Sequence, residues 1–366
     1  MNLDIIPLHL GLSHFHTPSV AIEAMQEAVA QHQTFYGPNE GLPELRYALA
    51  QRYLEDDGVP IPAEQILITH GTKHALHLYL HSLLQPGDEV VAPAPYWFAF
   101  PELVRQSGGK LVPVPANPEE EYRLNVEELR SRITPATKLL LLTNPGNPTG
   151  KVYSWAELQQ VAALLEEFPN LHLLSDEIYD GLGYKGPLPS FLRFESLRDR
   201  VAVVNGFSKS FAMSGWRIGY LIAPFPILEK AVELQQKWIS GVSPFLQAGA
   251  VEAIRQRHRI WQQFRTELEA KRERVTTVLQ KMPKLQFTVP DAGYYVTLQV
   301  DRCLRPQDPA SPFQLVEEWA AALKDQVGLE VLPATNMGMP GAVRMSFALP
   351  DDVLENALLR LQAFVS

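Results

Sequence analysis

Short apolar runs alternate with longer stretches of helical spacing along residues 64–223, and this alternation constrains the fold more than any other feature. Alternating strands and helices form a parallel sheet covered by helices, so we predict an α/β fold with a mostly parallel seven-stranded sheet flanked by helices. The seven runs with the length of strands are Ile66–Thr69, Glu89–Ala92, Lys110–Val114, Lys138–Thr143, Leu171–Ser175, Val201–Asn205 and Ile218–Ala223.

Two of the predicted helices have clear boundaries. One is expected over Thr72–Leu84, and another begins after Ser154, which forms a capping box with Glu157, and ends near Phe168. After Pro226, long charged segments of helical spacing continue to about residue 281. These segments predict helices that connect two domains.

The remainder of the chain, roughly residues 283–366, mixes strands and helices and predicts a smaller α+β domain. Its strands are expected near Phe287 and over Tyr294–Val300, Glu330–Leu332 and Ala342–Phe347. We therefore expect an N-terminal segment that packs with the small domain, a large ligand-binding domain and the small domain itself. These parts are residues 1–35, 36–255 and 256–366.

Composition excludes several classes of protein. The 366 residues are 46% hydrophobic and 20% charged, which is typical of a soluble globular protein. A net charge of −9 without a basic stripe argues against nucleic-acid binding. The apolar runs are too short to span a membrane, and Met1–Leu8 lacks the pattern of a signal peptide. Because Cys303 is the only cysteine, no intrachain disulfide can form, and we expect a cytoplasmic protein.

Residues suited to ligand binding follow four of the predicted strands, at the edge where open α/β sheets bind their ligands. The loop His70–Lys73 opens a helix, so Gly71, Thr72 and the free backbone N–H groups would stabilise a phosphate. The loop Asn144–Gly150 contains two prolines and two glycines, which would hold Asn147 in one orientation. Each of these loops alone is also compatible with a plain turn.

The third loop begins with two carboxylates, Asp176 and Glu177, at the end of an apolar strand. Burying a carboxylate is costly unless it meets a cation, and a protonated pyridine nitrogen would be such a partner for Asp176. Glu177 would point the other way because strand side chains alternate between faces, so we assign it a structural role.

The fourth loop, Ser208–Arg217, contains Lys209 and follows another buried strand. Its small residues leave room for a bulky ligand beside the backbone, and Arg217 offers a cation for a phosphate. A lysine in a desolvated site near a second cation becomes a better nucleophile, which suggests a Schiff base to an aldehyde cofactor. The cofactor with both an aldehyde and a phosphate is pyridoxal 5′-phosphate.

In this order and spacing, the motifs resemble those of class I pyridoxal-phosphate aminotransferases, the fold-type I group related to aspartate and aromatic aminotransferases. The resemblance extends from Gly11 to Arg344. It is carried by Tyr36–Gly41 with Leu45 and Arg46, by Asn144–Gly150, by Asp176–Tyr179 and by Ser208–Gly219. It implies the fold-type I architecture, a cofactor-binding large domain, and the transfer of an amino group from an L-amino acid to a 2-oxo acid by a ping-pong mechanism.

The resemblance also implies roles around the cofactor ring. Lys209 would bind the aldehyde and then move the proton between the substrate Cα and the cofactor. Asp176 would pair with the pyridine nitrogen, and Asn147 and Tyr179 would hydrogen-bond the ring hydroxyl. Trp97 would stack on the face of the ring, although packing in the core is an alternative for this side chain.

Further roles follow for the phosphate, the substrate and the partner subunit. The residues that would hold the phosphate are Gly71, Thr72, Lys73 and Arg217. Tyr36 would reach the phosphate bound by the partner subunit, which requires a homodimer. Arg344 would clamp the substrate α-carboxylate with two parallel hydrogen bonds, assisted by Asn147 and the backbone of Gly11.

The chain departs from the family pattern at several places, two of which concern the expected site. The loop Gly11–Pro18 replaces a segment that usually reads Gly-Glu-Pro-Asp-Phe followed by Thr-Pro, and the chain before it is short. Gly206 stands where many relatives have a phosphate-binding serine. With Leu12, Phe15 and Trp97 expected near the mouth of the site, we favour a neutral or aromatic amino acid as the substrate.

Other interpretations remain at this stage. Four histidines recur close to one face of the first helix, and such a row can bind zinc, although we expect no metal; they are His70, His74, His77 and His81. The same cofactor and fold would also serve a carbon–sulfur β-lyase. A third hypothesis is a non-catalytic scaffold. The complete set of lysine, aspartate, asparagine, tyrosine and arginine expected around the cofactor and substrate argues against it.

Overall fold

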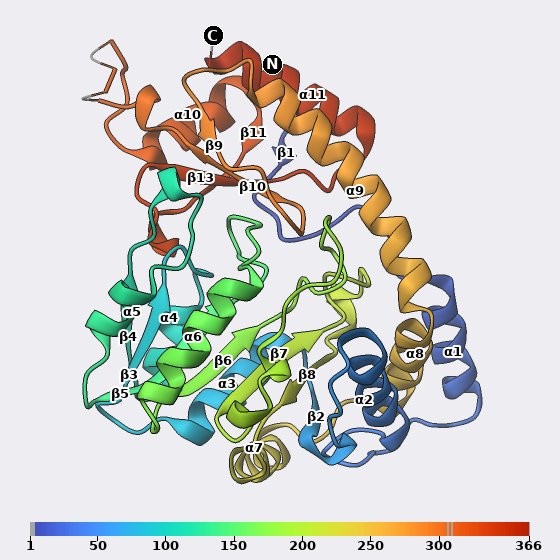
Figure 1. Ribbon diagram of the computed structural model, residues 1–366. Coiled ribbons are helices and arrows are strands. Elements are labelled where there is room, and N and C mark those ends of the chain that lie inside the picture. Colours follow the sequence, from blue (N-terminus) through green and yellow to red (C-terminus); the bar gives the residue numbers. More distant parts are fainter. Residues whose placement is uncertain (1–3, 306, 309, 366) are drawn as a thin grey trace.

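The computed structural model describes residues 4–305, 307–308 and 310–365; residues 1–3 and 366, at the ends of the expected first and last domains, lie outside this description. Seven strands form one large sheet in the order β2-β8-β7-β6-β5-β3-β4 (Figure 1). The strands from β7 to β4 are parallel, and β8 is antiparallel to both of its neighbours, β7 and β2. The predicted, mostly parallel seven-stranded sheet is therefore confirmed.

The strands of this sheet begin and end within one residue of the predicted positions. They are β2 (Ile66–Thr69), β3 (Glu89–Pro93), β4 (Lys110–Val114), β5 (Thr137–Thr143), β6 (His172–Asp176), β7 (Val201–Gly206) and β8 (Gly219–Ile222). In β5, Leu140 and Leu142 belong to one hydrophobic core, while Leu139 and Leu141 belong to the other. Successive side chains point to opposite faces, so a continuous apolar run is what a sheet buried on both faces requires.

Helices cover both faces of the large sheet. On one face lie α3 (Thr72–Leu83), α4 (Phe100–Gln106) and α7 (Phe225–Trp238). On the other lie α2 (Pro43–Asp57), α5 (Val126–Arg132), α6 (Trp155–Glu167) and α8 (Pro244–Arg255). The capping box predicted at Ser154 and Glu157 is present at the start of α6.

A smaller antiparallel sheet in the order β12-β13-β10-β9 lies beside the large one, with α10 (Val316–Val327) and α11 (Asp351–Val365). Its strands are β9 (Gln286–Phe287), β10 (Tyr295–Gln299), β12 (Leu332–Pro333) and β13 (Ala342–Ser346). The prediction of a single strand over Glu330–Leu332 is wrong, because two short strands lie there. The chain changes partners at Val331, so that β11 (Leu329–Glu330) pairs with β1 (Ile6–Pro7), whereas β12 pairs with β13.

Helix α9 (Arg257–Leu279) runs along one edge of the molecule from the layers of the large sheet to the small sheet (Figure 1). The division into domains, and with it the expected connection by the segments after Pro226, stays a prediction. Helix α7 buries an apolar face against α3, and α8 packs on α1 (Ser19–Ala30) and α2. The expected boundaries at 35/36 and 255/256 stay predictions. In the described part of the chain, no helix combines the length and hydropathy that crossing a bilayer requires.

Candidate active site

The four loops predicted to bind a ligand meet at one cavity of about 370 Å³. It lies at the carboxyl ends of β5 and β6 and at the start of α3, where open α/β sheets bind ligands. The predicted residues in its lining are Gly11, Thr72, Lys73, Trp97, Asn147, Asp176, Tyr179, Lys209, Arg217 and Arg344. Gly71 and Tyr36 are outside the lining.

Lys209 extends from the loop after β7 into this cavity, and its Nζ donates a hydrogen bond of 2.5 Å to the carbonyl of Gly11. Burial lowers the pKa of Lys209, and the cations Arg344 and Arg217 lower it further, whereas Tyr295 and Asp176 act in the opposite direction. A lowered pKa increases the fraction of neutral amine, which is the form that attacks a carbonyl or accepts a proton.

Asp176 ends β6 and is buried at the floor of the cavity. Its carboxylate accepts a hydrogen bond of 3.2 Å from the backbone N–H of Ile178, yet burial raises the pKa of Asp176 to about 7. A buried carboxylate in this state favours a cationic ligand beside it. Glu177 points away, as predicted, and accepts a hydrogen bond of 3.0 Å from the hydroxyl of Ser190.

One end of the cavity has the donors that a phosphate requires. The hydroxyl of Thr72, in the first turn of α3, is buried and has no hydrogen-bond partner among the described residues. Arg217 has a left-handed backbone (φ +54°), and its guanidinium lies over Gly71, where a Cβ would be 2.3 Å from Nη2. Gly71 thus makes room for Arg217. The free N–H groups at the start of α3 complete an anion-binding site.

Arg344, on β13, is buried and also lines the cavity. Its Nη1 donates to Oδ1 of Asn147 at 2.9 Å and its Nη2 to the carbonyl of His9 at 2.8 Å, while its Nε has no partner among the described residues. The Nδ2 of Asn147 donates in turn to the hydroxyl of Tyr179 at 3.3 Å. A guanidinium fixed in this way, with a donor to spare, is suited to a carboxylate.

The backbone of the N-terminal segment contacts both Arg344 and Lys209. His9 provides the carbonyl beside Arg344, and the hydrogen bond from Ser346 N–H to Leu8 fixes the register of this segment. The expected help of the Gly11 backbone in binding the substrate α-carboxylate stays a prediction. The carbonyl of Gly11 accepts from Lys209 and, at 3.0 Å, from the hydroxyl of Tyr294.

Two aromatic side chains predicted to contact the cofactor lie in very different surroundings. Trp97 is half-buried in the wall of the cavity, with the Nζ of Lys73 5.0 Å from the centre of its ring. Tyr36 lies between α1 and α2 and is 93% exposed. Its expected contact with a partner subunit stays a prediction.

Of the three residues expected near the mouth of the site, only Trp97 lines the cavity. Leu12 is 51% exposed, and Phe15 stacks on Phe264 with ring centroids 4.1 Å apart, so neither belongs to the cavity lining. The lining residues that sequence reasoning missed include His9, Leu10, Phe98, Tyr295 and Leu332. The pair Tyr294-Tyr295 after Gly293 was a usable signal, whereas the course of the N-terminal segment depends on tertiary contacts.

The histidine row on α3 packs against other residues. His70 Nε2 lies 3.2 Å from the carbonyl of Ser240, and the rings of His77 and His81 each lie 5.3 Å from the ring of Trp238. Within the described ranges, no group of three or more His, Cys, Asp or Glu side chains is placed to hold a metal ion.

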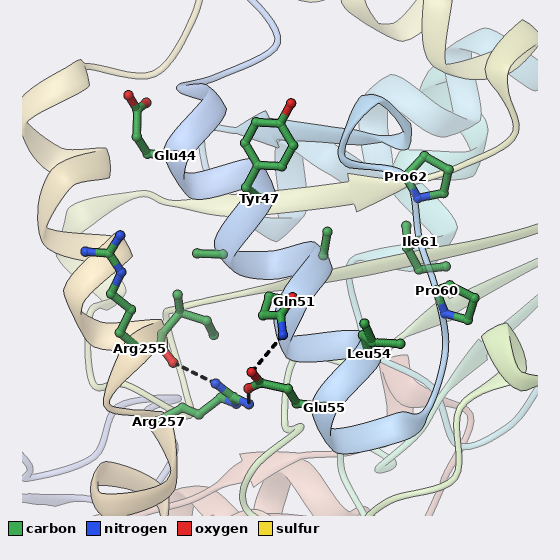
Figure 2. A pocket seen from close by; sticks show the side chains of 13 residues that line it. Glu44, Tyr47, Gln51, Leu54, Glu55, Pro60, Ile61, Pro62, Arg255 and Arg257 are labelled. Carbon is green, nitrogen blue, oxygen red and sulfur yellow. Dashed lines mark hydrogen bonds and ion pairs between the residues drawn. The ribbon is translucent and has the colours of Figure 1, made fainter.

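A larger hollow of about 910 Å³ lies over α2 and the junction of α8 and α9 (Figure 2), and Lys209 is not in its lining. It contains none of the predicted site residues. Its Glu55 accepts hydrogen bonds from Arg257 at 2.6 Å and from Gln51 at 2.9 Å, so these polar groups satisfy one another. The smaller cavity is therefore the candidate active site.

Comparisons with known proteins agree on one family. Residues 4–361 match the family described as aminotransferase class I and II. An aspartate aminotransferase of Bacillus sp. (strain YM-2) is 32% identical over 99% of this chain and 92% of its own length. The aspartate/prephenate aminotransferase of Thermus thermophilus is 34% identical over 98% of this chain and 90% of its own length.

Solved structures of such enzymes have the same fold. The aromatic aminotransferase of Pyrococcus horikoshii OT3 superposes with a TM-score of 0.93 at 31% identity, covering 98% of this chain and 95% of that one. The aspartate aminotransferase of Thermus thermophilus with maleate superposes with a TM-score of 0.92 at 32% identity, covering 99% of this chain and 92% of that one.

Proposed function

The chain belongs to the class I and II aminotransferases, and from this premise we propose how its own residues carry out the reaction. Enzymes of this family use pyridoxal 5′-phosphate, and the protein is a pyridoxal-phosphate-dependent aminotransferase. The observation that carries the residue-level proposal is that Lys209, Asp176 and Arg344 line one cavity with the start of α3.

The polar groups that line the cavity suit the functional groups of the cofactor. The hydroxyl of Thr72, the N–H groups of α3 and Arg217 would hold its phosphate, and the buried Asp176 would hold a proton at its ring nitrogen. When bound, pyridoxal phosphate supplies an electron-accepting ring that weakens the bonds at the Cα of an attached amino acid. Tyr179 and Asn147, already hydrogen-bonded to each other, would orient the ring hydroxyl.

Two groups act on the substrate. Arg344, fixed by Asn147 and His9, binds the α-carboxylate and thereby sets the direction of the Cα–H bond. Lys209, whose pKa is lowered by burial, takes the proton from Cα and returns it during transfer.

We propose that the enzyme accepts acidic as well as aromatic or neutral donors. Its relatives are named for aspartate and prephenate, and one solved relative holds the dicarboxylate maleate. Lys73, exposed over Trp97, would meet a distal carboxylate, while Leu10, Phe98 and Leu332 provide apolar wall. The variant Lys73→Met should lower kcat/KM for aspartate about tenfold and leave phenylalanine unaffected. An equal loss for both donors would mean that Lys73 serves the phosphate instead.

We further propose a cytoplasmic homodimer in which Tyr36 reaches the cofactor phosphate of the partner subunit. Tyr36 and Phe35 are 93% and 80% exposed, which is unusual for adjacent aromatic residues of a monomer. The lone buried Cys303 fits a reducing compartment.

Half-reactions test the proposed function. Loaded enzyme mixed with an amino donor alone should release one equivalent of 2-oxo acid per site and then stop until an acceptor oxo acid is added. The names of the relatives do not favour the carbon–sulfur lyase. Continuous formation of pyruvate and ammonia from a cysteine conjugate, without any acceptor, would contradict the proposal and support a lyase.

A further inference from the structure

Tyr295 on β10 lies between the two groups that act on the substrate. Its ring is 4.1 Å from the guanidinium carbon of Arg344, which lies on the neighbouring strand β13. Its hydroxyl and the amine of Lys209 both lie beside Gly11, since a Cβ on Gly11 would be 2.9 Å from the hydroxyl oxygen and 3.3 Å from Nζ. Tyr295 is 2% exposed and lines the cavity.

We propose that Tyr295 is a positioning residue of the transfer reaction: its ring holds the plane of Arg344, and its hydroxyl holds the amine of Lys209 in line with the substrate Cα. This inference rests on the proposed function. A single side chain would then position both Arg344, which binds the carboxylate, and Lys209, which moves the proton.

The chemistry of the neighbouring groups explains why a hydroxyl is needed beside the amine. The carbonyl of Gly11 only accepts hydrogen bonds, so it can hold the amine through an N–H but cannot donate to its lone pair. A hydroxyl accepts from an ammonium and donates to a neutral amine. The hydroxyl of Tyr295 can therefore follow Lys209 through both protonation states.

The other two tyrosines of the cluster connect Tyr295 to the rest of the site. The hydroxyl of Tyr294 donates to the carbonyl of Gly11, that of Tyr179 accepts from Asn147, and both side chains hydrogen-bond to Tyr295. The ring of Tyr295 lies 4.9 Å from that of Tyr294 and 5.9 Å from that of Tyr179, so the cluster fixes its orientation.

Two variants separate the hydroxyl from the ring. Tyr295→Phe should lower kcat about tenfold and leave KM within about twofold, since only the amine is misplaced. Tyr295→Leu should also raise KM for the amino donor about tenfold, because Arg344 loses its support. The matched control is Tyr79→Phe, which removes a buried hydroxyl that has no partner among the described residues and lies outside the cavity.

A second readout does not depend on turnover. In the full-length protein freed of cofactor, the rate of reductive methylation of Lys209 is followed against pH by peptide mass spectrometry. Tyr295→Phe should move the midpoint to lower pH, because a hydroxyl that accepts from the ammonium stabilises the charged form. Tyr79→Phe should not move it. An unchanged midpoint and an unchanged kcat in Tyr295→Phe would overturn the inference, whereas a wild-type enzyme that fails the half-reaction would overturn the proposed function.

Discussion

Asp176 is a buried acid whose ionised form is destabilised by burial, and the hydrogen bond from the N–H of Ile178 offsets this only in part. Burial raises its pKa to about 7, well above the value near 3.9 of an unfolded chain. In the protein without cofactor, protonated Asp176 therefore contributes to the free energy of unfolding. This contribution is complete below about pH 4 and is lost as the pH rises through about 7.

The variant Asp176→Asn isolates this contribution. Between pH 4 and 8, the cofactor-free wild type should lose about 4 kcal/mol of unfolding free energy relative to Asp176→Asn, as measured by urea unfolding. Loading the cofactor should abolish most of the difference, because the ring nitrogen then supplies the cation. A loss that persists in the loaded protein would show that Asp176 does not meet a cation there.

Thr72 has a buried hydroxyl without a partner among the described residues, at the end of the cavity assigned to the phosphate. Thr72→Val keeps the shape and removes the donor, so the Kd for pyridoxal phosphate should rise about tenfold in a fluorescence titration. Thr276→Val, at an exposed position of α9, is the control and should leave the Kd unchanged. An unaltered Kd in Thr72→Val would place the phosphate elsewhere.

The site residues that could be predicted from the sequence are those that directly follow strands. Asp176, Asn147 and Lys209 were found because a buried strand fixes where its next residues lie, and open sheets bind ligands at that edge. His9 and Tyr295 were missed because they reach the cavity through the pairing of β10 with β13 and the course of the N-terminal segment. The tyrosine pair after Gly293 was a local signal for Tyr295, whereas the contact of His9 has no local signature in the sequence.

At the scale of elements, the pairing of β7 with β8 explains a departure from the family pattern. Gly206 lies opposite Gly219, and a Cβ on Gly206 would be 2.9 Å from the Cα of Gly219 and 2.9 Å from the carbonyl of Ile218. The serine that the family resemblance led us to expect at this position would not fit here, since backbone atoms on two strands would have to move apart.

We therefore expect Gly206→Ser to destabilise the protein by about 1–3 kcal/mol and to weaken cofactor binding. Gly215→Ser is the matched control, because a Cβ on Gly215 meets nothing within 4 Å. Thermal unfolding of the two variants checks this. Equal stabilities would mean that β7 and β8 separate easily and that Gly206 is not required by packing.

Element type was predictable where a segment is long and periodic, and unpredictable where it is short. The strands of the large sheet are buried on both faces, and their apolar runs mark them clearly. The two-residue strands β11 and β12 have no such pattern, since each exists only because a partner strand lies beside it.

At the scale of the whole molecule, we propose a domain boundary near 255/256, where α8 ends and the long α9 begins. Helix α9 and the N-terminal segment then join the small sheet to the large one. The cavity is lined by residues next to the large sheet and by residues of the small sheet. A movement of the small sheet would therefore change the size of the cavity.

The proposed homodimer predicts complementation between two impaired variants. In a mixed dimer of Lys209→Ala and Tyr36→Phe subunits, one site would combine an intact Lys209 with the partner's intact Tyr36. Mixing and refolding the two variants should therefore restore up to about half of the wild-type activity in the mixed dimers. If Tyr36 acts in its own subunit, no mixed site is intact, and the mixture should be no more active than its components.

The central claim is that the buried amine of Lys209 holds the cofactor at this cavity. Reducing the loaded enzyme with borohydride and mapping its peptides by mass spectrometry tests the claim most directly. We predict one added pyridoxyl mass per chain, on the peptide that contains Lys209, and none in Lys209→Ala. A pyridoxyl group on another lysine, or on none, would contradict the account.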